Sequence, residues 1–199
     1  MRYNIVAIER EYASGGREIG DKLAEKVEIP CYGEEILEMA AKKLNMPHNQ
    51  LREAEESITG NVLFGLAAYA NLTSGQDLDL LKLEQKLAIT ETEIIRGLSV
   101  NPCVLIGRAA SALLNNKNVL RVFIHADHRT RIDRAISTYG IDPKQAESVL
   151  QRYDKRRANY FKATTEKGWK YPDIYHMSLN SGLLGIGQVV DILYTTIEG

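Results

Sequence analysis

The sequence predicts an α/β fold, a three-layer αβα sandwich built on a five-stranded parallel sheet. Short apolar runs rich in β-branched residues alternate along the chain with longer segments of helical periodicity, a pattern that favours parallel strands joined by crossover helices on both faces of the sheet. The chain has 199 residues, enough for one well-buried domain. The predicted strands are residues 4–8, 29–32, 103–107, 120–124 and 175–179.

Composition narrows the class of protein. A 44% hydrophobic and 26% charged content is that of an ordinary globular chain. The pI of about 6.4 and the few aromatic residues among the basic ones argue against nucleic-acid binding. The two cysteines, Cys31 and Cys103, are predicted to be buried free thiols. We expect no signal peptide and no membrane span, and therefore a cytoplasmic protein.

The first strand, turn and helix occupy residues 3–29. Ile5 to Ile8 form the apolar strand, and from Arg17 the apolar residues recur every four positions as in a helix. Between them, Ser14, Gly15 and Gly16 are small residues whose backbone N–H groups could face an anion at the helix start. The P-loop pattern has a Lys-Ser/Thr pair after its last glycine. Here Arg17 and Glu18 follow, so the residues fit either a phosphate loop or an ordinary βα turn.

The middle of the chain is predicted to be largely helical. Residues 34–44 and 80–98 have helical periodicity, and the second of these helices is expected to carry Glu91 on its outer face. Residues 45–80 are less regular, with a helix beginning after Pro47. Arg52 on that helix is a candidate phosphate ligand or part of a solvated face. The apolar residues of this stretch could pack on the core, line a base pocket or contact a second subunit; they are Phe64, Leu66, Tyr69 and Leu72.

Basic residues gather in the second half, where they outnumber acidic ones over residues 117–170. Arg108 stands at the carboxyl end of the predicted strand 103–107, where ligands of parallel sheets collect, and is either a ligand or a structural residue. Asp127 is a predicted N-cap for the following helix. A second helix, expected from Ile141 through Phe161, carries the basic residues Arg152, Lys155, Arg156 and Arg157. An anion is therefore expected in this region.

Several segments together resemble the cytidylate kinase-like family, a branch of the P-loop nucleoside monophosphate kinases. The opening REYASGGREIGDKLAEK is similar to the family's R-E-[YF]-G-S-G-G-R-E-I, and four later segments follow in the family's order: PCVLIGRAA, LRVFIHAD, RYDKRRANYF and YHMSLNSGLLGI. The resemblance covers nearly the whole chain and is weakest from about Pro47 to Glu84. It implies one P-loop kinase-like domain over residues 1–199, with a helical acceptor-side insertion at about 45–98 and a lid at about 150–170.

The resemblance also implies an activity, the transfer of the ATP γ-phosphoryl group to a nucleoside monophosphate, CMP or dCMP first. Ala109 stands where cytidylate kinases have an Asp after the Arg that matches Arg108. Magnesium is expected as the cofactor of ATP, held by water, Ser14 or a carboxylate such as Glu9, Glu11 or Glu18, and no dedicated metal site is predicted. The expected roles are donor-phosphate binding by Ser14, Gly15, Gly16, Arg17 and Glu18, with Arg17 in place of the Lys; acceptor-phosphate binding by Arg108 and Arg52; and neutralisation of the transferring group by Arg152, Arg156 and Arg157.

Two other functions fit the same residues. Without a working phosphate loop, the protein would be a regulatory module that binds nucleotides and transfers nothing. With another acceptor, it would be a kinase for a different small metabolite. The expected partners are nucleotide substrates, and the sequence leaves open a homo-oligomer.

Overall fold

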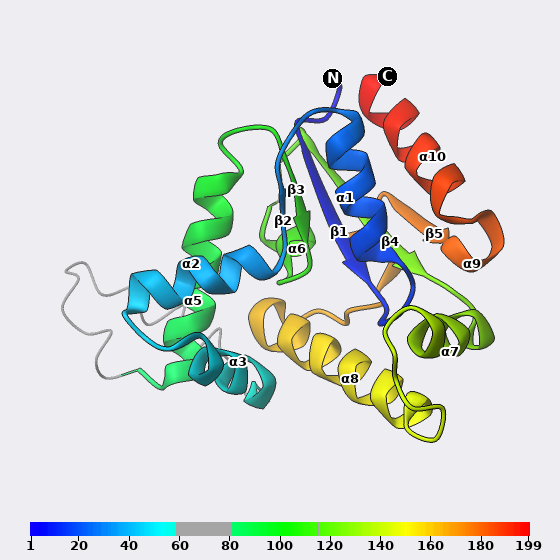
Figure 1. Ribbon diagram of the computed structural model, residues 1–199. Helices are drawn as coiled ribbons and strands as arrows, with labels where there is room; N and C mark the ends of the chain where they lie inside the picture. Colours follow the sequence, from blue (N-terminus) through cyan, green and yellow to red (C-terminus); the bar gives the residue numbers. More distant parts are fainter. Residues whose placement is uncertain (59–80, 115) are drawn as a thin grey trace.

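The computed structural model describes residues 1–58, 81–114 and 116–199, which fold around a five-stranded sheet with the order β2-β3-β1-β4-β5 (Figure 1). All neighbouring strands are parallel, as predicted. The central strand β1 pairs Ile5 with Cys103 of β3 and with Val119 of β4. The strands are β1 (Ile5–Arg10), β2 (Cys31–Tyr32), β3 (Cys103–Ile106), β4 (Val119–His125) and β5 (Met177–Asn180).

The helices follow the predicted order. As expected, Asp127 caps one of them, because its side chain accepts a hydrogen bond from the Thr130 N–H. The helix that carries the basic cluster begins at Ala146, so the expected start at Ile141 is wrong. Gly140, with φ +66°, and Pro143 interrupt the helical path there. The helices are α1 (Gly16–Lys26), α2 (Glu34–Leu44), α3 (His48–Ser57), α5 (Leu83–Leu98), α6 (Ala110–Leu113), α7 (His128–Ser137), α8 (Ala146–Thr165), α9 (Ser181–Leu184) and α10 (Ile186–Glu198).

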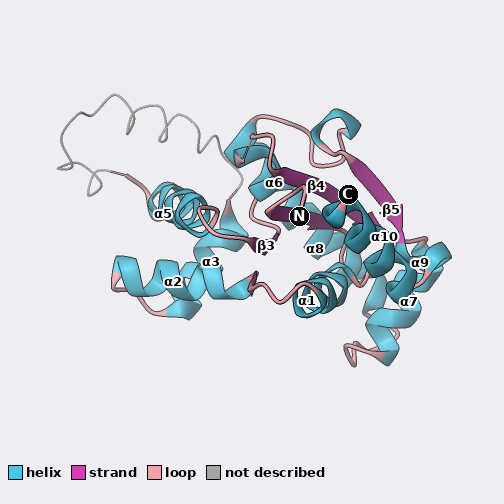
Figure 2. Ribbon diagram, turned by 90° about the horizontal axis from the view of Figure 1, so that it is seen from above, coloured by secondary structure: helices cyan, strands magenta, loops and turns pink. Residues whose placement is uncertain are grey.

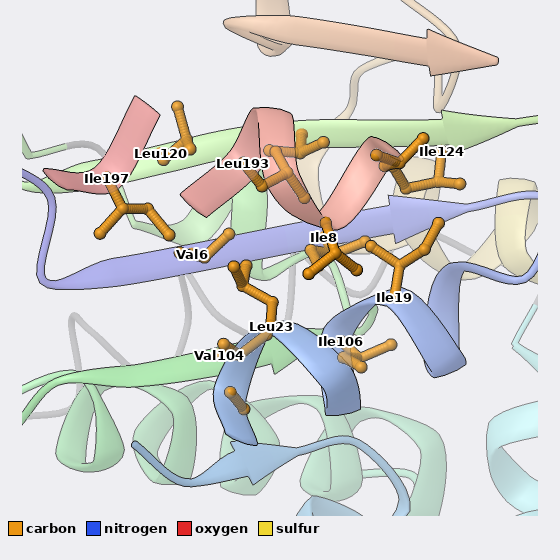
Figure 3. Packing of buried hydrophobic residues seen from close by; sticks show 14 residues of the cluster. Val6, Ile8, Ile19, Leu23, Val104, Ile106, Leu120, Ile124, Leu193 and Ile197 are labelled. Carbon is orange, nitrogen blue, oxygen red and sulfur yellow. The ribbon is translucent and has the colours of Figure 1, made fainter. Parts of the chain in front are cut away.

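Helices cover both faces of the sheet. On one face, α1 and α10 lie side by side and bury Ile19, Leu23 and Leu193 against the strands (Figure 3). On the other face, α5 and α6 pack on the opposite side chains of the same strands, including Ile5 and Leu105. Successive strand residues therefore serve two separate cores, which is the reason that the central strands are apolar throughout.

Three helices form a separate group beside the β2 edge. α2, α3 and α5 pack together around a small core that includes Leu37, Leu51 and Leu87 (Figure 2). The segment of residues 45–98, which is predicted to be an acceptor-side insertion, contains α3 and α5. Residues 59–80 of that segment, with the predicted apolar contacts of Phe64, Leu66, Tyr69 and Leu72, lie outside the described residues.

The two cysteines and the single tryptophan can be located in the structure. Cys31 and Cys103 are free thiols, and Cys103 is buried while Cys31 is half-buried. Trp169 is buried in the connector between α8 and β5, where it packs on Phe123. None of the helices in the described ranges has the length and apolar character needed to cross a bilayer.

Candidate functional site

The turn between β1 and α1 is tightly held. Gly15 adopts a φ of +78°, and a Cβ on it would lie 2.4 Å from Ile186 Cδ1 and 3.2 Å from the Arg134 guanidinium. The Ser14 hydroxyl donates to the Glu11 carbonyl at 2.9 Å, and the Ser181 hydroxyl donates to the Ser14 carbonyl at 2.5 Å. The unpaired N–H groups at the start of α1 therefore adjoin a turn that requires glycine at position 15.

The charged residues that follow the loop are engaged elsewhere. The Arg17 guanidinium lies between α1 and α2, where it bonds Asp21 at 2.8 Å and Glu35 at 3.1 Å. Glu18 pairs with Lys22 at 2.7 Å and with Arg134 at 3.1 Å, and the first-named pair is the main reason that its pKa is lowered. Of the five predicted donor-side residues, Ser14, Gly15 and Gly16 thus form the loop, whereas Arg17 and Glu18 flank it.

A cavity of about 170 Å³ opens at the carboxyl ends of β1 and β3, between α3 and α8. It brings together four arginines that the sequence singled out from distant segments: Arg52, Arg108, Arg156 and Arg157. Arg17 and Arg152 do not line it. The other residues that line the cavity are Glu9, Arg10, Glu34, Glu55, Glu56, Ala109, Tyr153, Tyr160 and Phe161.

Arg108 is bound on several sides by the protein itself. Its Nε bonds the Glu91 carboxylate at 2.8 Å, its Nη1 donates to the Gly33 carbonyl at 2.7 Å, and its Nη2 lies 3.2 Å from Glu55. Glu91 is completely buried, so its expected place on the outer face of α5 is wrong. The Tyr160 hydroxyl donates to Glu91 at 2.5 Å. This hydrogen bond and the ion pair with Arg108 offset the cost of burying the Glu91 charge. Burial raises the pKa of Glu91, and Glu55 adds to the effect.

The predicted acceptor and lid segments meet across the cavity. Arg156 of α8 forms a 2.7 Å ion pair with Glu56 of α3, and its guanidinium lies 5.4 Å from the centre of the Tyr153 ring. Arg52 pairs with Glu34 at the start of α2. Arg152 is exposed, and its guanidinium lies 5.5 Å from the Tyr153 ring centre.

Two further cavity residues are Glu9, which the sequence suggested only as a magnesium ligand, and Arg10, which was not among the predicted site residues. Glu9 is buried beside the Ser111 hydroxyl, and this burial raises its pKa to about 7. Arg10 is the last residue of β1, and burial, followed by the neighbouring Arg157 charge, lowers its pKa to about 9. The signal in the sequence that could have placed both in the cavity is their position, because they directly end a buried strand before a glycine turn.

A buried charge network holds the loop against α7 and α8. Arg131 bonds Glu11 at 3.2 Å, Asp154 at 2.5 Å and the Tyr12 carbonyl at 2.8 Å. The Tyr12 N–H donates to Asp154 at 2.7 Å, and Lys170 reaches Glu11 from the connector. Arg131 lies on α7 and is buried. Its partners fix the path of the loop.

The proposed magnesium ligands do not form a metal site of their own. Glu9 is buried beside the Ser111 hydroxyl. Glu11 is paired with Arg131 and Lys170, Glu18 is paired with Lys22 and Arg134, and the Ser14 hydroxyl bonds the Glu11 carbonyl. Over the residues that the structure describes, no group of three His, Cys, Asp or Glu side chains is placed to hold a metal ion. These residues do not fit a magnesium ion held by the protein alone. Such an ion would depend on the oxygens of a bound phosphate.

Comparison with known proteins gives this site a context. The chain matches the sequence profile of the cytidylate kinase-like family over residues 5–183. No curated protein matches it. An uncharacterized protein from Eubacterium ventriosum superposes with a TM-score of 0.73 at 25% identity, covering 98% of both chains.

Shikimate kinases have the same fold. The enzyme from Acinetobacter baumannii, solved in complex with shikimate, gives a TM-score of 0.51 at 10% identity over 98% of this chain and 93% of its own. The enzyme from Bacteroides thetaiotaomicron gives 0.52 at 11% identity over 98% of both chains. At these identities the likeness concerns the fold, which is that of the P-loop kinases.

Proposed function

The chain belongs to the cytidylate kinase-like family, and from this we propose that it is a phosphotransferase that moves the ATP γ-phosphoryl group to a nucleoside monophosphate, CMP or dCMP first. One structural observation supports the proposal in addition to the family membership. Arg52, Arg108, Arg156 and Arg157, which come from the predicted acceptor and lid segments, line a single cavity. That cavity adjoins the glycine loop, because the Arg10 side chain both lines it and packs on Gly16.

The donor and acceptor would occupy neighbouring sites. The donor phosphates would lie on the loop from Ser14 to Gly16, at the positive end of α1 and near the Arg134 guanidinium. The acceptor would enter the cavity, where Arg156 and Arg157 of α8 offset the charge of the transferring group. Closure of α8 over the site would exclude water and so limit ATP hydrolysis.

The proposal is tested by chromatographic detection of diphosphate products. Purified protein is incubated with Mg-ATP and, separately, with CMP, dCMP, UMP, AMP and GMP. We expect more product from CMP or dCMP than from the others. Arg157→Gln should lower turnover about 100-fold or more, because a charge that stabilises the transition state is removed. Arg129→Gln is the matched control, since Arg129 is 92% exposed on α7. Product from none of the acceptors would reject this function and favour the nucleotide-binding module.

Arg17 provides a separate test of catalysis. If Arg17 leaves Asp21 and Glu35 to meet the donor phosphates, Arg17→Ala should lower turnover by far more than it lowers ATP affinity. Steady-state kinetics and direct ATP binding measure the two effects. Equal small losses in both would indicate that Arg17 only joins α1 to α2.

A further inference from the structure

The arginines that line the cavity differ in what they contact. Arg52, Arg108 and Arg156 each pair with at least one glutamate. Arg10 and Arg157 have no carboxylate within ion-pair distance among the residues described in the structure. The two cavity arginines with uncommitted charges are therefore Arg10 and Arg157.

Arg10 reaches the cavity through space left by two glycines. A Cβ on Gly16 would lie 2.5 Å from Arg10 Cβ, and a Cβ on Gly107 would lie 1.9 Å from Arg10 Nη1. Gly107 also has a φ of +75°, which disfavours any other residue. The Arg10 side chain thus runs from the end of β1, past the start of α1, to the end of β3, and glycines stand at both points of closest approach.

Arg157 approaches the same place from α8. Its Nη1 donates to the Arg10 carbonyl at 3.0 Å, and its guanidinium lies 5.5 Å from the centre of the Tyr12 ring. Burial lowers the pKa of both arginines, and for Arg10 the neighbouring Arg157 charge is the next cause. Two desolvated positive charges without a carboxylate partner are unfavourable unless an anion enters between them.

We propose that Arg10 and Arg157 form an anion site that binds a phosphate dianion in this cavity, whereas the charge of Arg108 is used within the protein. Two guanidinium groups match the charge of a phosphate dianion, and each can bond two of its oxygens. Arg108, by contrast, would have to exchange Glu91 and Glu55 for the ligand. The source of the phosphate rests on the proposed function: it is the phosphate monoester of the acceptor or the terminal phosphate of ATP.

Calorimetric titration of the full chain separates these sources. Wild type, Arg10→Gln and Arg157→Gln are each titrated with CMP and cytidine, with ATP and ADP, and with inorganic phosphate. We expect Arg10→Gln and Arg157→Gln to bind either CMP or ATP about 10- to 100-fold more weakly than wild type does, because charge-assisted hydrogen bonds are lost. The affinity for the matching ligand without that phosphate, cytidine or ADP, should change less than about twofold. Arg129→Gln, an exposed arginine on α7, should match wild type.

Each outcome decides a different point. A loss confined to CMP assigns the site to the acceptor phosphate, and a loss confined to ATP assigns it to the terminal phosphate of the donor. Unchanged affinity of both variants for every probe, with wild-type circular dichroism, would overturn the anion site. If Arg10→Gln does not fold, Arg157→Gln on α8 tests the same site. The titration measures binding and not turnover, so it is independent of kinase activity. If phosphate binding depends on Arg10 but the product assay detects no kinase activity, the proposed function is rejected and the anion site is retained.

Discussion

Glu9 and Arg10 are consecutive and oppositely charged, Glu9 is buried and Arg10 is half-buried, yet they do not form an ion pair with each other in the described structure. Strand geometry explains this separation, because successive side chains of a strand point to opposite faces of the sheet. Glu9 lies beside Ser111, whereas Arg10 lies beside Gly16 and Gly107. Each residue therefore carries its own cost of burial, which is visible in their shifted pKa values.

The raised pKa of Glu9 predicts how stability depends on pH. In the folded protein its pKa is about 7, above the ordinary value of 4.5, so the folded state keeps a proton that the unfolded state releases between these values. The Glu9 contribution to the free energy of unfolding is therefore largest below pH 4.5, falls as the pH rises to about 7 and is then constant. Glu9→Gln removes this fall. We expect the variant to gain up to about 3 kcal/mol relative to wild type between pH 4.5 and 7.5.

Urea unfolding at several pH values measures that gain. Glu53→Gln on α3 is the control, because Glu53 is exposed. If the free energy of unfolding depends on pH in the same way for Glu9→Gln and Glu53→Gln, the pKa of Glu9 is not the cause of the pH dependence.

The positions of the helices and strands could be predicted from the sequence better than the contacts of their charged residues. Apolar periodicity is a local property, so strands such as β4 and helices such as α2 were recognised from the sequence. Arg131 and Glu91 sit at positions whose spacing indicates a solvated face, and both are buried. Their partners, Asp154 and Arg108, are 23 and 17 residues away, so no local pattern reveals them.

One contact between elements joins the glycine loop to α8. The rings of Tyr12 and Tyr153 stack with centroids 4.4 Å apart and planes 9° apart. A double-mutant cycle with Tyr12→Leu and Tyr153→Leu should give a coupling of about 0.5–1.5 kcal/mol in the free energy of unfolding, because each single change already removes the stack. The control cycle combines Tyr12→Leu with Tyr171→Leu, where Tyr171 is 53% exposed. Additive losses in the first cycle would show that the stack contributes little to holding α8.

In the molecule as a whole, the sequence predicted which edge of the sheet has the candidate cavity, but not how the charged residues of that cavity are paired. The carboxyl ends of parallel strands meet at one edge, so Arg108 could be placed there from the strand pattern alone. Which arginine has a free charge depends on glutamates from α2, α3 and α5, which only the folded chain brings to that edge. Arg10 directly ends the first strand, but its place in the cavity depends on its approach to Gly107, which is far away in the sequence.

Variants at Arg108 and Glu91 test whether the charge of Arg108 serves the structure of the protein and not the binding of a ligand. Arg108 joins the end of β3 to α2, α3 and α5, and Glu91 is fully buried. Arg108→Met leaves the Glu91 charge without its cationic partner and should cost about 3–5 kcal/mol in the free energy of unfolding. The double variant with Glu91→Met removes both charges and should recover most of this loss. Urea unfolding of wild type, both single variants and the double variant measures the recovery.

The same double variant separates a structural Arg108 from a phosphate ligand. Because Arg10 and Arg157 are unchanged in it, a folded Arg108→Met/Glu91→Met protein should bind CMP or ATP within about threefold of wild type, less than the loss of one charge-assisted hydrogen bond would cause. A folded double variant that no longer binds its nucleotide would show instead that Arg108 contacts the phosphate. Additive losses of stability would show that Glu91 is held independently of Arg108, by Tyr160 and its apolar surroundings.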